Sequence, residues 1–521
     1  MPLRVRSLAQ SPTTALSRFP RSLRLMLVLA SLLFPLLGNA HVGSPHIVFQ
    51  GKAGLFPVTV VVRQPDVVPG LVDIHIRVHE GAPRQVTALA MHSSTGRKGA
   101  PRPDLARPVE GETNLYNAQL WFMTRGAYGV EVMVDGEGGG ALMVPVNSVA
   151  LERRPMPAWL VGIASALLLF LAVGVISICV AAVRESTLPA ATPVLLSGRR
   201  LRSWIGGVLG LTVVVGAVFG ARLWWNYEDE LHQSKVLFRP LQHTLAVETS
   251  ASGSQLRLEL TDRRMSQRNY RLLPDHGKWV HLFLVGAGDR PAFAHLHPVR
   301  DTNTHTFVSL LPNLPAGEYR VFVDLTHEQG LTQTLTNRVR IEEGLAATGK
   351  LTDPDDSWSP SQAPGEGTCG LGPGLRMTLQ PTAPLRVGQP IGLEAAVATD
   401  SGDKVTLEPY LRMLGHAVVM RADGTVFSHV HPAGTLSMAA ARKFAAKDGG
   451  EEAARATDAI CGDLDALPEA QAIAMGRLGK VSFPYVFPSA GEYRIWVQVK
   501  VQGRIVSGTF KVQVEAGRSD E

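Results

Sequence analysis

Short apolar runs separated by Gly, Pro and Asp make up most of this chain. Between residues 41 and 150 they cover 57–63, 72–79, 116–122, 128–134 and 141–146, and no useful helical period appears there. Further on, Gln255–Leu260 alternates apolar and polar residues, as a half-buried strand does. Regularly spaced short strands are typical of β-sandwiches.

A second repeat divides the chain into units. The segments 126–132, 317–323 and 491–497 each have a Gly, a Tyr two residues later and then an alternating run. This pattern resembles the tyrosine corner of immunoglobulin-like sandwiches. We therefore predict a mainly β fold with three immunoglobulin-like β-sandwich domains, at 41–150, 243–343 and 374–516.

Two segments interrupt this order. Residues 344–373 are rich in Gly, Pro and Asp and are predicted to be a linker. Residues 433–480 enlarge the third domain relative to the second and contain runs rich in Ala, Lys, Arg and Glu. They predict a helical insertion, either a tethered surface excursion or a lid over the neighbouring histidines, with Met438 and Met475 as soft ligands in the second case.

Two stretches are long and apolar enough to be transmembrane helices, 158–183 and 204–223. The loop between them, 184–203, carries four Arg against one Glu, so it is expected in the cytoplasm. Both large flanks then lie on the outer side of the membrane. The high Ala, Gly, Pro and Arg content is typical of a bacterium, which predicts an inner-membrane protein with its N-terminal and C-terminal regions in the periplasm.

The N-terminus agrees with export. Arg21 and Arg24 precede the apolar run 25–37, and Gly38-Asn39-Ala40 follows it. This predicts a signal peptide over 1–40 whose cleavage leaves His41 first, although an uncleaved anchor would give the same topology.

Composition and charge limit the classes of molecule that this chain is expected to bind. The 521-residue chain has a formal charge of +6, much of it in the first 24 residues and the loop at 199–202, and no basic patch is interleaved with aromatics. We therefore expect a lipid bilayer, and no nucleic acid, as partner. Of three cysteines, Cys369 and Cys461 fall in the last exported region and are predicted to form a disulfide; two free thiols are the alternative.

The candidate chemistry lies in two matching hairpins. Each has an apolar run opened by a His, a turn, and a His-x-His-Pro. Residues i and i+2 of a strand point to one face, so each hairpin brings three imidazoles to one side. The candidate metal ligands are His281, His295 and His297 in the second domain and His416, His429 and His431 in the third, with His305 and His327 as extra candidates in the second.

Imidazole clusters suit copper or zinc. His41 is a further candidate, because a mature N-terminal His offers its amino group and ring together, with His46, His75, His79 or His92 available to join it. The exported location and His41 place copper before zinc. No Cys adjoins either triad, which argues against a blue-copper centre. The alternative interpretation is a polar strand face in contact with water.

A family resemblance enters through the third domain. Residues 375–379, 387–390, Gly415-His416 and 491–494 resemble the YtkA-like and FixH-like periplasmic domains, and the second domain shares this pattern in part. His41 and the strands of the first domain resemble CopC-type copper-binding proteins in outline. These resemblances imply membrane-tethered periplasmic domains linked to metal handling and no catalytic activity.

No catalytic motif was found either. The sequence thus predicts a non-enzymatic protein that binds a transition metal for trafficking or resistance. The alternative is a scaffold whose sandwiches bind a periplasmic protein partner.

Overall fold

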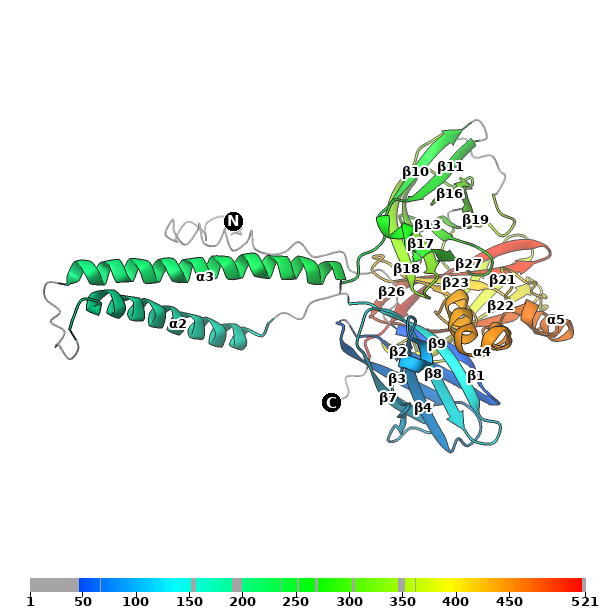
Figure 1. Cartoon of the computed structure of the whole chain (residues 1–521). Coiled ribbons are helices and arrows are strands. Elements are labelled where there is room, and N and C mark those ends of the chain that lie inside the picture. Colours follow the sequence, from blue (N-terminus) through cyan, green and yellow to red (C-terminus); the bar gives the residue numbers. More distant parts are fainter. Residues whose placement is uncertain are drawn as a thin grey trace, which may run out of the picture. The chain divides into compact units, whose positions relative to one another are not determined.

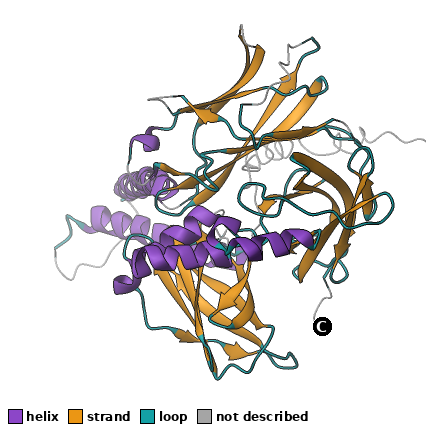
Figure 2. Ribbon diagram, turned by 90° about the vertical axis from the view of Figure 1, so that its right-hand side faces the viewer, coloured by secondary structure: helices purple, strands orange, loops and turns teal. Residues whose placement is uncertain are grey.

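The structure is a computed structural model (Figure 1). The residues it describes are 46–65, 67–150, 156–189, 199–235, 237–250, 253–267, 270–301, 305–344, 352–360 and 362–517. The predicted signal peptide and His41 lie outside the described residues. Strands dominate, as predicted, and helices are confined to a few segments (Figure 2).

The first β domain consists of two sheets around one core, in which alternate strand residues such as Ile74, Ile76 and Val132 are fully buried. The strand orders are β1-β2-β3-β7-β6 and β5-β4-β8-β9. The strands are β1 (His46–Ala53), β2 (Phe56–Arg63), β3 (Gly70–Val78), β4 (Gln85–His92), β5 (Asp104–Leu105), β6 (Arg107–Pro108), β7 (Leu115–Phe122), β8 (Gly126–Asp135) and β9 (Gly140–Ser148). A short 3-10 helix, η3 (Gly96–Gly99), follows β4.

Two long helices come next, α2 (Ala158–Glu185) and α3 (Arg200–Lys235), and both are long and apolar enough to cross a membrane. They pack against each other through small residues. A Cβ at Gly206 would lie 2.7 Å from the Cys179 carbonyl oxygen, and one at Gly210 would lie 2.8 Å from the Ile176 Cα. This Gly-x-x-x-Gly spacing lets two helix backbones approach closely, as in membrane helix pairs.

The second β domain also has two sheets around one core. Their orders are β10-β11-β16-β15 and β12-β17-β13-β14-β19, with β18 paired to β17. The strands are β10 (His243–Ser250), β11 (Gly253–Leu260), β12 (Leu272–Leu273), β13 (His281–Gly286), β14 (Phe293–Leu296), β15 (Val299–Arg300), β16 (Thr306–Leu310), β17 (Gly317–His327), β18 (Thr332–Ile341) and β19 (Ser357–Ser359), and η4 (Arg263–Ser266) is a 3-10 helix.

The third β domain pairs the sheets β20-β21-β22-β25 and β24-β23-β26-β27. The strands are β20 (Thr368–Gly370), β21 (Leu375–Pro381), β22 (Pro390–Thr399), β23 (His416–Arg421), β24 (Phe427–Val430), β25 (Lys480–Val486), β26 (Gly491–Val501) and β27 (Arg504–Val514). The insertion between β24 and β25 is helical as predicted, with α4 (Met438–Ile460), η6 (Leu464–Ala466) and α5 (Glu469–Arg477).

The Gly-x-Tyr repeat forms the same local structure three times. Its glycines open β8, β17 and β26 with φ of 138°, 149° and 133°, a region that side chains rarely adopt. Each tyrosine hydroxyl hydrogen-bonds to the residue four positions earlier: Tyr128 to Thr124, Tyr319 to Pro315 and Tyr493 to Ser489. The repeat therefore has a structural role, and the immunoglobulin-like assignment stays a prediction.

The segment 344–373 does more than link two domains. It supplies β19, which pairs with β14 of the second domain, and β20, which pairs with β21 of the third. Its Gly and Pro content predicted irregular backbone, but short edge strands need only two or three residues with partners.

The predicted disulfide is absent, because Cys369 and Cys461 are both free. Cys369 lies in the core of the third domain, whereas Cys461 packs into the core of the first. The insertion carries Cys461 there: Gln50 N–H donates to the Ala433 carbonyl (2.7 Å) and Thr435 N–H to that of Val48 (3.0 Å).

The second and third domains meet through equivalent faces. A buried cluster takes four residues from each: Phe283, Val285, Phe293 and Phe322 from the second, and Val418, Met420, Phe427 and Trp496 from the third. Its stacked aromatic pairs are reciprocal, with Phe293 on Trp496 at 5.1 Å between ring centroids and Phe322 on Phe427 at 3.9 Å. Such reciprocity is that of a two-fold symmetric dimer interface, here formed within one chain.

Candidate metal centre

Both predicted histidine hairpins form. Strands β13 and β14 pair antiparallel, and so do β23 and β24. The first His of each motif opens β13 or β23, the second lies within β14 or β24, and the third follows directly. Five of the six are at most 4% exposed: His281, His295, His297, His416 and His431. His429 has a side chain only 6% exposed. A polar face in contact with water is therefore not what the structure contains.

The histidines gather across the domain boundary. The sequence predicted one set of three per domain, but the structure sorts their ligand atoms differently. One group consists of His281, His295 and His429, and a second of His276, His416 and His431. Within each group all ligand atoms lie within 4.8 Å of one another. The hairpin faces meet because the apolar faces below them pack together, so each group needs both domains.

Side chains from the two long strands lie beside the central rings in a reciprocal arrangement. The Nδ1 of His295 lies 2.9 Å from Oε1 of Gln498, and the Nδ1 of His429 lies 3.7 Å from Oδ2 of Asp324. Gln498 is the strand partner of His416, and Asp324 is the strand partner of His281. Each domain thus places an acceptor from its long strand beside a histidine of the other.

Carbonyl acceptors fix the protonation of His281 and His295. The Asp275 carbonyl can only accept, so His281 donates to it through Nε2 (3.2 Å). The Tyr410 hydroxyl donates to the Asp355 carbonyl (3.3 Å). Its oxygen is then an acceptor for Nδ1–H of His295 (3.3 Å), as is Oε1 of Gln498. A neutral imidazole has one N–H, so the other nitrogen of each ring carries a lone pair.

These two lone pairs face each other. The Nδ1 of His281 and the Nε2 of His295 are 3.1 Å apart, and neither has a proton to donate. Two nitrogens bound at about 2.0–2.1 Å to one tetrahedral ion lie about 3.3 Å apart. A cation between them would turn a repulsive contact into coordination, and His429 is placed as a third ligand.

Burial keeps the ligands neutral. It lowers the pKa of His281 to about 4 and that of His276 to about 3. It also lowers the pKa of the remaining five, His295, His297, His416, His429 and His431. Metal ligation requires the neutral ring, so no proton has to leave at neutral pH.

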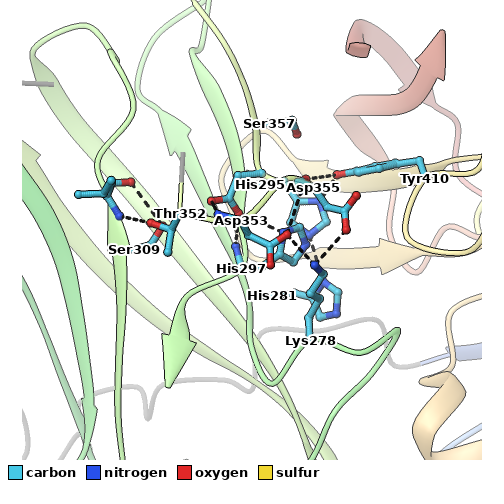
Figure 3. Close-up of polar contacts among 12 residues, drawn as sticks. Lys278, His281, His295, His297, Ser309, Thr352, Asp353, Asp355, Ser357 and Tyr410 are labelled. Atoms are coloured by element: carbon cyan, nitrogen blue, oxygen red, sulfur yellow. Dashed lines mark hydrogen bonds and ion pairs between the residues drawn. The ribbon is translucent and has the colours of Figure 1, made fainter. Parts of the chain in front are cut away.

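A carboxylate-rich segment adjoins the cluster (Figure 3). Asp356 accepts from the backbone N–H of His297 (2.6 Å) and from its Nδ1 (3.1 Å). The Lys278 ammonium pairs with Asp353 at 2.6 Å and Asp355 at 2.9 Å. His297, Asp353 and Asp356 form a third converging group, but Lys278 already supplies positive charge there. The hydrogen bonds from His297 to Asp356 orient the His297 ring.

Other predicted candidates are used elsewhere. His75 contacts Asp73, His79 contacts Thr59 and His92 contacts Ser94. His327 lies between the Tyr270 carbonyl and Gln333. None of these four, nor His305, belongs to a converging group among the described residues. Met438 lies in the hydrophobic core of the first domain, and the partly buried Met475 packs against that of the third, so both have the ordinary role of an apolar side chain.

His276 is the ligand candidate that sequence reasoning missed. It stands five residues before His281, outside the hairpin, in a turn where it has φ of 51°. The turn is closed by reciprocal hydrogen bonds between Asp275 and Lys278. The only available signal was the pairing of an Asp-His-Gly turn with the following His.

Fold and site together define a class: a mainly β protein with two helices able to cross a membrane and histidine clusters able to hold a metal ion. A family model described as a domain of unknown function (DUF8832) matches residues 372–516, which is the third domain. No curated protein matches the chain.

Solved structures add no functional argument. The chain is similar to dimeric latent PorU from Porphyromonas gingivalis, with 8% identity, TM-score 0.15 and coverage of 91% of this chain and 34% of that one. A putative membrane anchored protein from Corynebacterium diphtheriae has 10% identity and TM-score 0.13, covering 90% of this chain and 96% of that one. The chain thus spans about a third of the PorU chain that it matches.

Proposed function

We propose that this protein is a membrane-anchored periplasmic protein that binds a transition metal, copper before zinc, for trafficking or resistance. One observation carries the proposal: the lone pairs of His281 and His295 face each other at 3.1 Å, fixed by carbonyl acceptors, with His429 beside them. A cation between the two nitrogens would relieve that contact, whereas burial opposes an added proton.

The donor set supports a borderline or soft transition metal. Three neutral imidazoles suit copper or zinc, whereas calcium and magnesium prefer oxygen ligands. A three-ligand site also leaves a coordination position open for exchange, as delivery of a metal to another protein requires. The expected export of these domains to the periplasm favours copper over zinc. Binding is proposed without catalysis, because the sequence carries no catalytic motif that we recognise.

A metal titration tests the proposal. The full-length chain in detergent, stripped with a chelator, is titrated with Cu(I), Cu(II) and Zn(II) beside His281→Ala and His295→Ala. His305→Ala is the matched control, since His305 lies in the same domain but in no converging group. We expect saturable binding at the first group in the parent and control, and the loss of that binding event in both cluster variants. A folded parent without saturable binding would favour the scaffold interpretation instead.

The membrane orientation needs its own test. Reporter enzymes active only in the periplasm are fused after residue 150 and at the C-terminus, and a cytoplasmic reporter is placed in the loop between α2 and α3. We expect all three to be active. Activity of a cytoplasmic reporter at the C-terminus would contradict the proposed topology.

A further inference from the structure

The second histidine group contains its own ligands. His276 comes from the turn before β13 in the second domain, while His416 opens β23 and His431 follows β24 in the third. Their ligand atoms converge within 4.8 Å, and none of the three belongs to the first group. The groups adjoin where the Nδ1 of His416 lies 3.1 Å from the Nε2 of His429.

Hydrogen bonding also leaves ring nitrogens of this group with a lone pair or without a partner. His431 donates through Nδ1 to the Leu436 carbonyl (3.0 Å), so its Nε2 carries a lone pair. That Nε2 lies 3.3 Å from the Nε2 of His276. The Nε2 of His416 is buried and has no hydrogen-bond partner among the described residues. An unpaired buried polar atom is costly unless something binds it.

Charge favours a cation here too. The carboxylate of Asp275 lies 3.8 Å from the Nε2 of His276 and also accepts from the backbone N–H of Ala439 at the start of α4 (3.0 Å). The corresponding turn of the third domain has Tyr410 in place of Asp275 and Leu411 in place of His276. It is closed in the same way, between Tyr410 and Met413, and Leu411 has φ of 49°.

This difference breaks the two-fold relation. The counterpart of the second group would need a ligand at position 411, where a leucine stands. We propose that the cluster binds two metal ions of the same class, the second at His276, His416 and His431, with Asp275 offsetting its charge. This inference rests on the proposed function, because the first ion occupies the first group.

Metal counting on the full-length chain in detergent tests the proposal. After loading with Cu(I) or, separately, Zn(II), and dialysis, we expect two ions per chain in the parent and one in His276→Leu with at least one of the two metals. Leucine stands at the equivalent turn position 411 with nearly the same φ, so it suits the backbone conformation at position 276. His295→Ala should also retain one ion, and the double variant none.

Each outcome bears on one proposal. One ion in the parent, or two in a folded His276→Leu, would overturn the second site and leave the proposed function standing. No ion in the folded parent would overturn both. If His276→Leu does not fold, His431→Gln serves instead, with one ion expected and two contradicting the assignment.

Discussion

Replacing Gln498 by leucine tests how the cluster fixes its lone pairs. Gln498 is buried in β26, accepts from Nδ1 of His295 at 2.9 Å and donates to the Ser357 hydroxyl. Leucine has a similar volume but no acceptor. The N–H of His295 would then depend on the longer contact to Tyr410, 3.3 Å, and the ring could take either tautomer.

The expected loss can be estimated. Removing the group that orients a metal-bound imidazole typically weakens binding by about 10–100-fold, or about 1.4–2.8 kcal/mol. In the metal-free protein, an unsatisfied buried donor costs about 1–3 kcal/mol in the free energy of unfolding. Competition against a chelator of known affinity measures the first effect, and denaturant unfolding of the stripped protein measures the second.

Gln498→Glu is the matched control. Its carboxylate still accepts from Nδ1 of His295. Like leucine, it cannot donate to Ser357, so the two variants differ only in the acceptor for His295. Affinity should therefore stay near that of the parent or rise, since a carboxylate makes the ring a better ligand. Unchanged affinity in a folded Gln498→Leu, or equal losses in both variants, would refute the orienting role.

Three further outcomes are expected. Because burial lowers the pKa of all seven clustered histidines, the unfolded chain binds more protons below pH 6.5. The free energy of unfolding of the metal-free protein should therefore fall from pH 6.5 toward 4, by up to about 1.4 kcal/mol per pH unit and histidine. Asp324 and Asp356, whose pKa values burial raises to about 7 and 6, offset part of this, and stability that rises on acidification would contradict the assignment. Trp496→Ala should cost about 3–5 kcal/mol in thermal or denaturant unfolding and weaken metal binding, whereas Trp121→Ala, 62% exposed, should change neither; equal effects would argue against the domain interface. Thiol titration of the denatured, unreduced protein should find three free cysteines, and a lower count would indicate a disulfide.

Much of the local structure could be predicted from the sequence. Apolar runs gave the positions of β2, β3, β7, β8 and β9 in the first domain but not those of β1 and β4. The helical insertion and both long helices lie where composition placed them. The two histidine hairpins formed because their signals are local: a turn between apolar runs, and i, i+2 spacing within a strand. The Gly-x-Tyr repeat likewise depends on contacts only four residues apart.

Long-range contacts could not be predicted. Cys461 reaches the core of the first domain because the insertion pairs with β1, and no local pattern around residues 433–435 signals an edge-strand partner. His276 was missed because it stands 155 positions from His431 in the chain, and the two residues meet only when the second and third domains dock. The segment 352–359 similarly gains its order from β14 and His297, which lie outside it.

Domain pairing changes what a repeated motif means. Two His-x-His-Pro hairpins suggest two equal sites, one in each domain, yet each converging group takes ligands from both domains. A single domain would present its three histidines on a face whose apolar neighbours, such as Phe283 or Trp496, are also exposed. Docking buries those aromatics and the imidazoles in one step, so the hydrophobic contact supplies the free energy that holds neutral, lone-pair-bearing rings together. A metal that bridges the two domains would in turn stabilise their pairing, because it binds the docked state and not the separated one.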